Sequence, residues 1–284
     1  MLCRVMGFPK SSLYYRESVQ RRPPSAVDVE NDRLRERIKS IHRDSLGTYG
    51  SPRITAALRR EGEIVNQKRV RRLMAEAGVV GITRRRSGRS KAATIAAAAR
   101  EARVADDLVH RDFAVTAPDL VWFADITEHP TDEGKVYLAS VLDAFEKSIV
   151  GWSMGESATT ELVVNAVEMA ITRRQPIIAP VHHSDRGTQY TSLEFSERLT
   201  TLGLTPSMGS RGDAFDNAVI ESWHATLQTE LLDRQQWRTR AELKTAIFYF
   251  IEVFYNRRRL HSSLGYQSPS EHGRRYAETL AVGS

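Results

Sequence analysis

Three acidic residues beyond position 120, Asp125, Asp185 and Glu221, have the chemistry of ligands for divalent metal ions. Carboxylate oxygens are the hard ligands that Mg²⁺ prefers. Two such ions held ~3.5–4 Å apart activate an attacking hydroxyl and stabilise the leaving oxygen of an in-line phosphoryl transfer. The acids therefore predict phosphodiester chemistry with two Mg²⁺ ions per active site, for which Mn²⁺ can substitute.

The three acids differ in how strongly each one alone indicates a ligand. Asp125 lies in an apolar stretch, where an unpaired carboxylate is costly to bury and needs a cation or a donor. Asp185 follows an apolar stretch, at a position where open α/β sheets commonly place ligand-contacting residues. Glu221 projects from a stripe of small side chains on an expected helix, where a single glutamate is usually a solvated surface acid. The metal-site interpretation therefore depends on all three acids coming together.

The neighbouring histidines and the lone cysteine predict no other metal site. His182, His183 and His224 lack HExxH or comparable spacing, so we expect them to contact ligand residues or substrate rather than a metal. Cys3 has no disulfide partner, and no Cys/His spacing predicts structural zinc. No apolar run reaches the ~18 residues of a membrane span. We expect a cytoplasmic protein with no membrane partner.

The elements that must position the acids follow from the hydrophobic pattern. Three strands joined by short turns indicate an antiparallel meander, and two further strands alternate with helices. The expected strands are 120–127, 136–142, 148–154, 177–181 and 205–208; the expected helices are 161–173, 193–202 and about 213–232. This order predicts an α/β core with a mixed sheet flanked by helices.

A compact helical unit precedes this core. Between residues 32 and 81 the apolar residues fall at helical spacing in three short runs. Asn66 is the expected N-cap of the last helix, and Gly78 its expected stop. One face of that helix carries Lys68, Arg69, Arg71 and Arg72. The pattern is typical of a helix-turn-helix unit whose last helix enters a DNA groove, although a solvated charged face is the plainer alternative.

The charge distribution favours the DNA-binding interpretation. Residues 1–103 contain 24 Lys and Arg against 10 Asp and Glu, whereas residues 104–284 carry a net charge of −8. A basic segment of this density is typical of a surface that binds a polyanion. Arg84, Arg85 and Arg86 open a stretch without sustained amphipathic period, which predicts a basic linker.

The residues around the acids resemble a known family, the bacterial insertion-sequence transposases of the IS-three type, OrfB product, within the retroviral-integrase-like superfamily. Segments 122–127, 183–190 and 216–222 match its patterns W-x-x-D-I-T, H-S-D-R-G-x-Q-Y and D-N-A-x-x-E-S, with 35 residues between Asp185 and Glu221. Segments 49–54, 66–74 and 255–261 and Pro269 are similar as well, so the likeness covers about residues 32–272.

The resemblance implies a ribonuclease H-like fold for the core. It also implies DNA strand cleavage, followed by strand transfer in which the freed 3′-hydroxyl attacks target DNA without a covalent protein intermediate. The implied partners are the transposon ends, target DNA, further copies of the chain on DNA, and an upstream-frame DNA-binding protein or a fusion with it.

One position departs from the family pattern. Family members often have Lys or Arg where this chain has Gln228, so other cationic residues would have to supply the phosphate contact. The expected DNA-contacting residues are Arg53, Lys68, Arg69, Arg71, Arg72, Arg84, Arg85, Arg86, Arg186, Gln228, Arg257, Arg258 and Arg259.

We predict five segments: a lead segment 1–31, a helix-turn-helix domain 32–83, a basic linker 84–113, a catalytic core with a helical basic tail 114–272, and a C-terminal tail 273–284. Two other functions stay open at this stage. A protein that occupies transposon ends without catalysis would not need the three acids, and a ribonuclease H-type nuclease without strand transfer would have less need of the basic front domain.

Overall fold

The computed structural model describes residues 23–82, 115–184, 193–208 and 218–283. The chain divides into two compact units, Met1–Gly81 and Ile82–Ser284. Within the described ranges, none of the helices is long and apolar enough to cross a bilayer.

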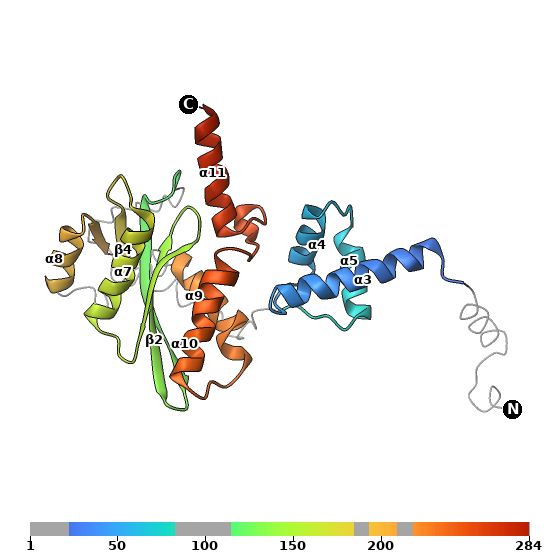
Figure 1. The fold of residues 1–284 in the computed structure, drawn as a ribbon, viewed down its shortest axis with the longest axis horizontal. Coiled ribbons are helices and arrows are strands. Elements are labelled where there is room, and N and C mark those ends of the chain that lie inside the picture. The colour runs from blue at the N-terminus through green and yellow to red at the C-terminus, as the bar shows by residue number, and fades with distance from the viewer. Residues whose placement is uncertain (1–22, 83–114, 185–192, 209–217, 284) are drawn as a thin grey trace, which may run out of the picture. The chain divides into compact units, whose positions relative to one another are not determined.

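In the described part of the first unit, residues 23–81, lie the helices α3 (Ala26–Asp44), α4 (Ser51–Arg60) and α5 (Gln67–Glu76) (Figure 1). Each of the three predicted apolar stripes contributes buried residues; these are Leu34, Ile38, Ile41, Ile54, Leu58, Val70, Leu73 and Met74. Helix α3 begins before the expected stripe because Ser25 and Asp28 form a reciprocal capping box. Pro52 lies in the first turn of α4, where its missing N–H is tolerated.

Helix α5 has the ends that the sequence predicts. The Asn66 side chain accepts the Lys68 backbone N–H at 2.8 Å, which caps the first turn. Gly78 follows the helix with a φ of 66°, in the left-handed region that favours glycine. The cap and the stop thus fix which residues of this short helix share the face opposite its apolar stripe.

The second unit is built on a five-stranded mixed sheet in the order β3-β2-β1-β4-β5. The first three strands form the predicted antiparallel meander, and β4 and β5 add to it in parallel next to β1. The strands are β1 (Val121–Thr131), β2 (Gly134–Asp143), β3 (Ile149–Gly155), β4 (Val181–Ser184) and β5 (Thr205–Met208).

Helices cover both faces of the sheet (Figure 1). Helix α7 (Thr160–Arg174) packs on β2 and β3, and α8 (Leu193–Thr201) lies beside it. On the other face, α9 (Ala218–Glu230) contacts β1, and α10 (Arg240–Tyr249) contacts β2. The chain continues from α10 through a π-helix (Phe250–Tyr255) to α11 (Pro269–Gly283), and short 3-10 turns occur at Leu232–Arg234 and Ser262–Leu264.

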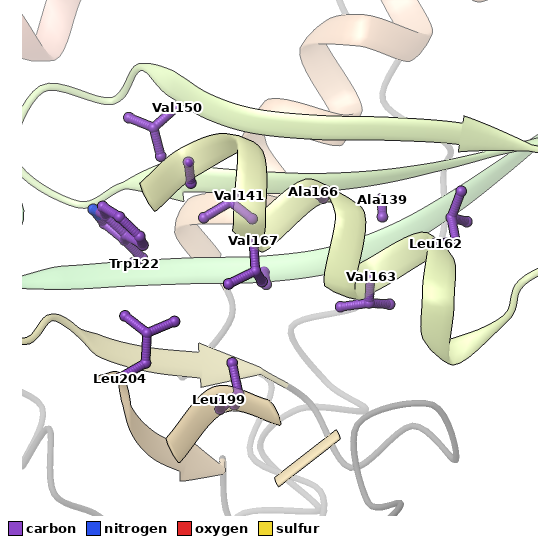
Figure 2. Packing of buried hydrophobic residues seen from close by; sticks show 12 residues of the cluster. Trp122, Ala139, Val141, Val150, Leu162, Val163, Ala166, Val167, Leu199 and Leu204 are labelled. Carbon is purple, nitrogen blue, oxygen red and sulfur yellow. The ribbon is translucent and has the colours of Figure 1, made fainter. Parts of the chain in front are cut away.

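The main apolar core lies between the sheet and α7 (Figure 2). Trp122 and Ala124 of β1 and Val141 of β2 pack there against Ala166 and other residues of α7. Because side chains alternate along a strand, Phe123 and Asp125 project to the opposite face. The apolar pattern of β1 therefore directs Asp125 toward the face that α9 covers.

The prediction for the fourth strand was wrong in position. The expected strand 177–181 is instead Val181–Ser184, and both Ile177 and Ile178 are exposed. Pro180 has no backbone N–H to give to a central ladder, so pairing starts only after it. The buried strand then contains His182 and His183, whose polarity hid it from the hydrophobic pattern.

Gly151 in β3 is required by the close approach of α7. A Cβ atom at this position would lie 2.0 Å from the backbone oxygen of Ala166. We expect Gly151→Ala to lower the free energy of unfolding by about 1–3 kcal/mol, because backbone cannot move aside as a flexible side chain can. Urea denaturation measures this change. Gly155→Ala in the same strand is the control, since the nearest atom to its Cβ would be the flexible end of Leu162 at 3.1 Å, with backbone no closer than 3.5 Å; equal effects would contradict the explanation.

Candidate active site

Asp125 lies in the central strand of the sheet, on the face toward α9. Its Oδ1 accepts the backbone N–H of Ile126 at 2.8 Å. The side chain is 23% exposed, so the carboxylate stays accessible to solvent. Its register partner on the neighbouring strand β2 is Ser140, which is buried. An ordered carboxylate with remaining access to solvent is suited to binding a cation.

The parallel pairing of β1 with β4 ends one residue before Asp125 and one residue before Asp185. Ser184, the last residue of β4, is the register partner of Ala124. The next residue on β1 is Asp125, and the next residue after β4 is Asp185. Asp185 itself lies outside the described residues.

Helix α9 brings the third acid to the same face. Glu221 lies in its first turn and is exposed. One turn later, His224 Nδ1 lies 3.3 Å from Asp125 Oδ2. Trp223 Nε1 donates to Ser140 Oγ at 3.3 Å. The helix that carries Glu221 is thus attached to both members of the Asp125 and Ser140 pair.

The meeting of all three acids stays a prediction. In the ranges that the structure describes, no three His, Cys, Asp or Glu side chains form a group able to hold a metal ion. One of the three expected ligands, Asp185, is outside those ranges. The residues present nevertheless fit a hard cation, because the chemistry offered is that of carboxylate oxygens.

The histidines differ in their surroundings. His182 and His183 are buried in β4, and burial lowers the pKa of His182 to about 4. The ring Nδ1 of His183 lies 3.1 Å from the Ser207 hydroxyl on β5, within the sheet. His224, in contrast, contacts the expected ligand Asp125, as the sequence analysis anticipated for a histidine near the acids.

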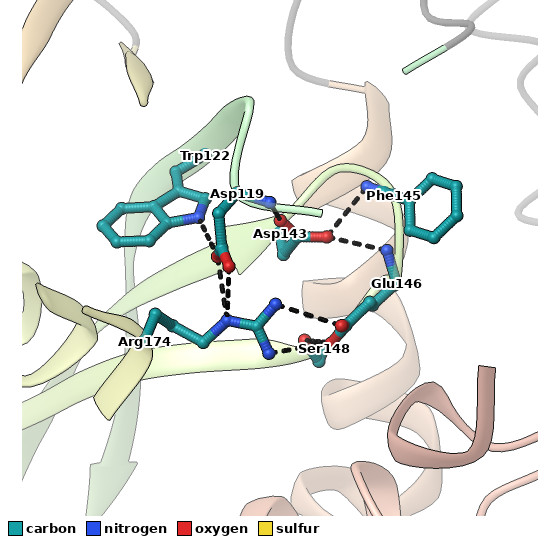
Figure 3. Close-up of polar contacts among 7 residues, drawn as sticks. All are labelled: Asp119, Trp122, Asp143, Phe145, Glu146, Ser148 and Arg174. Carbon is teal, nitrogen blue, oxygen red and sulfur yellow. Dashed lines mark hydrogen bonds and ion pairs between the residues drawn. The ribbon is translucent and has the colours of Figure 1, made fainter. Parts of the chain in front are cut away.

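A buried polar network fixes the start of β1 (Figure 3). Arg174 at the end of α7 donates to Asp119 at 2.8 Å and to Glu146 at 3.0 Å, and Trp122 Nε1 donates to Asp119. Asp143 accepts the backbone N–H groups of Asp119, Phe145 and Glu146. Burial raises the pKa of Asp143 to about 6, although these backbone donors act in the opposite direction. The network ties α7 and the β2–β3 turn to the strand that carries Asp125.

Arg259 corrects an expectation from the sequence. It was expected to contact DNA, but its side chain is only 5% exposed and makes two hydrogen bonds of 2.7 Å to Glu230 at the end of α9. Its guanidinium carbon also lies 5.6 Å from the ring centroid of Tyr255, which makes an edge contact with Trp223. Arg259 therefore anchors α9, whereas Arg257 and Arg258 are exposed.

Helix α5 places most of its basic residues outward. Lys68, Arg71 and Arg72 are exposed on the face opposite the buried stripe, and Arg72 pairs with Glu76 at 3.4 Å. Arg69 is half-buried, and its Nε donates to Asn31 of α3 at 3.0 Å. This hydrogen bond joins α5 to α3. Arg53 of α4 lies over the ring of Tyr49.

The remaining expected DNA contacts are in the second unit or outside the described residues. The Gln228 amide donates to Asp233, just beyond α9. Arg84, Arg85, Arg86 and Arg186 lie outside the described residues.

Comparison with known families identifies both units. Residues 30–87 match the model of an HTH-like domain, and residues 115–214 and 202–269 match models described as an integrase core domain. The helix-turn-helix and integrase-core assignments of the sequence analysis are thereby confirmed.

Individual proteins agree with these matches. The transposase for insertion sequence element IS904 of Lactococcus lactis is 37% identical over 88% of this chain and 97% of its own length. The transposase for element IS629 of Shigella sonnei is 36% identical over 98% of this chain and 92% of its own length. Among solved structures, the HTLV-2 integrase catalytic core domain in complex with magnesium aligns with a TM-score of 0.41 and 19% identity, covering 56% of this chain and 98% of that one.

Proposed function

The chain belongs to the insertion-sequence transposases that have an integrase core domain, and we propose that Asp125, Asp185 and Glu221 form its metal-binding active site. It is a polynucleotidyl transferase that acts in insertion-sequence transposition by cleavage and transfer of DNA strands. The catalytic chemistry of this family depends on divalent metal ions.

The β1–β4 register is the observation that carries the proposed site. Ser184 of β4 is paired with Ala124 of β1. The residue that follows Ala124 in the sequence is Asp125, and the residue that follows Ser184 is Asp185. The His224 contact supports the inclusion of Glu221, because residues three apart on a helix lie on one face.

We infer that the three carboxylates hold two Mg²⁺ ions, with Mn²⁺ as a substitute. The ions would polarise the phosphodiester and lower the pKa of a bound water or hydroxyl. The protein's part is to fix the carboxylates: Ile126 N–H holds one oxygen of Asp125, and the packing of Trp223 against β2 holds the helix of Glu221.

We propose that the exposed basic face of α5 contacts transposon-end DNA. Lys68, Arg71 and Arg72 are available there, and each phosphate contact releases counterions. Arg257 and Arg258 are exposed near the core and are the proposed phosphate contacts of the second unit. We retain the five-segment division, in which the linker 84–113 joins the DNA-reading unit to the core.

We further propose that the protein acts in the cytoplasm and assembles as a homo-oligomer on transposon ends and target DNA, with the upstream-frame protein or a fusion as a partner. The test of the function is a joining assay with candidate element ends, a target plasmid and Mg²⁺. Products joined to the plasmid are expected. Hydrolysis alone would favour a nuclease, and binding without either product would favour a non-catalytic DNA-binding protein.

Removal of three charges from α5 should change the salt dependence of DNA binding. For the variant with Lys68, Arg71 and Arg72 all replaced by Ala, we expect the slope of log K against log salt to fall by roughly 2.7, because each lost phosphate contact contributes about 0.9. Gel-shift titrations of the full chain at several salt concentrations measure this slope. Lys39→Ala is the control, since Lys39 is an exposed lysine on α3 and not on the basic face of α5; an unchanged slope in the triple variant would place the DNA elsewhere.

A further inference from the structure

His224 of α9 lies 3.3 Å from Asp125. We propose that His224 is a positioning residue, whose Nδ1–H fixes the Asp125 carboxylate in the orientation that accepts the divalent ion. This inference rests on the proposed function, since it takes Asp125 to be a metal ligand.

The contact is part of a two-point attachment between α9 and the sheet. Trp223 donates to Ser140 at 3.3 Å, and Ser140 is the register partner of Asp125. The adjacent His224 reaches Asp125 itself at 3.3 Å. Trp223 is buried and His224 has only 15% of its side chain exposed, so α9 lies close against the sheet at both contacts. A displacement of α9 would therefore alter the Asp125 carboxylate directly.

The surroundings of the imidazole ring assign its proton. Nδ1 faces a carboxylate oxygen, which is an acceptor, so Nδ1 carries the hydrogen. Nε2 is buried and, within the part of the chain that the structure describes, has no hydrogen-bond partner. Nδ1 is therefore the ring atom placed to act on Asp125.

His224 completes the restraint of Asp125. Oδ1 accepts the Ile126 backbone N–H at 2.8 Å, and Oδ2 lies 3.3 Å from His224 Nδ1. A carboxylate has about four acceptor positions, so each oxygen keeps a lone pair for a cation. Hydrogen bonds that orient a ligand in this way typically change metal affinity by about 10–100-fold. The helix of Glu221 thus also orients the ligand on β1.

Three substitutions separate the N–H donor from the bulk of the ring. Asn places an amide N–H near the position of Nδ1, Gln moves that amide one methylene further out, and Ala removes it. The probe is Mn²⁺ alone, added to the full chain without DNA and followed by the electron paramagnetic resonance signal of the free ion. We expect Mn²⁺ to bind about 10–100-fold more weakly to His224→Ala and His224→Gln, and His224→Asn to bind close to wild type.

Asp125→Asn in the same titration distinguishes failure of the proposed metal site from failure of the positioning role of His224. If it loses Mn²⁺ affinity while His224→Ala keeps wild-type affinity, the role of His224 is refuted and the metal site stands. If Asp125→Asn binds Mn²⁺ as wild type does, the proposed active site is refuted, and the positioning role with it. Weak binding by His224→Asn would also overturn the inference, because ring packing rather than the donor would then matter. Should the Ala variant fail to fold, the comparison of Asn with Gln carries the test.

Discussion

Asp125→Asn, Asp185→Asn and Glu221→Gln are each expected to lower the rate of strand transfer at least about a thousandfold, while DNA binding stays close to wild type. A divalent ion supplies several kcal/mol of transition-state stabilisation, and each 1.36 kcal/mol is tenfold in rate. The amides keep the size of the side chains and remove the charge that holds the ion. Joining assays with Mg²⁺ and gel-shift titrations on the same preparations measure the two effects.

Glu197→Gln is the matched control for these variants. Glu197 is an exposed acid on α8, so the same chemical change there should leave strand transfer unaffected. An amide variant of Asp125, Asp185 or Glu221 that retains near-wild-type transfer would remove that residue from the active site. Loss of DNA binding in parallel with transfer would instead indicate a damaged fold.

Arg259→Met is expected to lower the free energy of unfolding of the core by about 3–5 kcal/mol. Removing one partner of a buried ion pair leaves the other charge buried and uncompensated. Here Glu230, only 8% exposed, would lose both guanidinium hydrogen bonds. The four tryptophans, Trp122, Trp152, Trp223 and Trp237, all lie in the second unit. Tryptophan fluorescence during urea denaturation therefore follows the unit that contains the pair.

The double variant Arg259→Met with Glu230→Met tests the stated cause. Replacing a whole buried pair with apolar side chains is often nearly neutral, so most of the lost stability should return. Arg257→Met, at an exposed neighbouring position, should have little effect. A single Arg259 variant as stable as wild type would mean that the pair does not anchor α9. A double variant less stable than Arg259→Met would exclude an unpaired charge as the cause.

Much of the fold follows from local patterns. Strand-forming segments joined by short turns predict the meander, and the structure then places Trp122 and Asp125 on opposite faces of β1. The caps of α5 follow from Asn66 and Gly78, since capping chemistry is local. The strand β4 was misplaced because buried His182 and His183 break the rule that buried strands are apolar.

Contacts between distant segments are what the sequence does not predict. On α9, Val219 is only half-buried, whereas Ile220 and Glu230 are buried. Glu230 is tolerated in the core because Arg259, far along the chain, neutralises it. A basic cluster in a sequence therefore does not show which of its residues pair with an acid elsewhere in the fold.

The sequence points to the candidate acids of the site, but not to the contact that His224 makes with one of them. The acids were identified by their spacing and by the family pattern, both of which are visible in the sequence. The contact between His224 and Asp125 depends on how α9 lies on β1, which the spacing of residues does not give. The sequence signal was only that a histidine follows Glu221 by one helical turn.

The central claim is that Asp125, Asp185 and Glu221 hold divalent ions together. The most direct measurement is an anomalous difference map from crystals of the protein bound to an element end in the presence of Mn²⁺. We predict two peaks ~3.5–4 Å apart, with carboxylate oxygens from all three residues as ligands. Peaks coordinated by other side chains, or a map in which the three carboxylates point away from one another with no ion between them, would contradict the account.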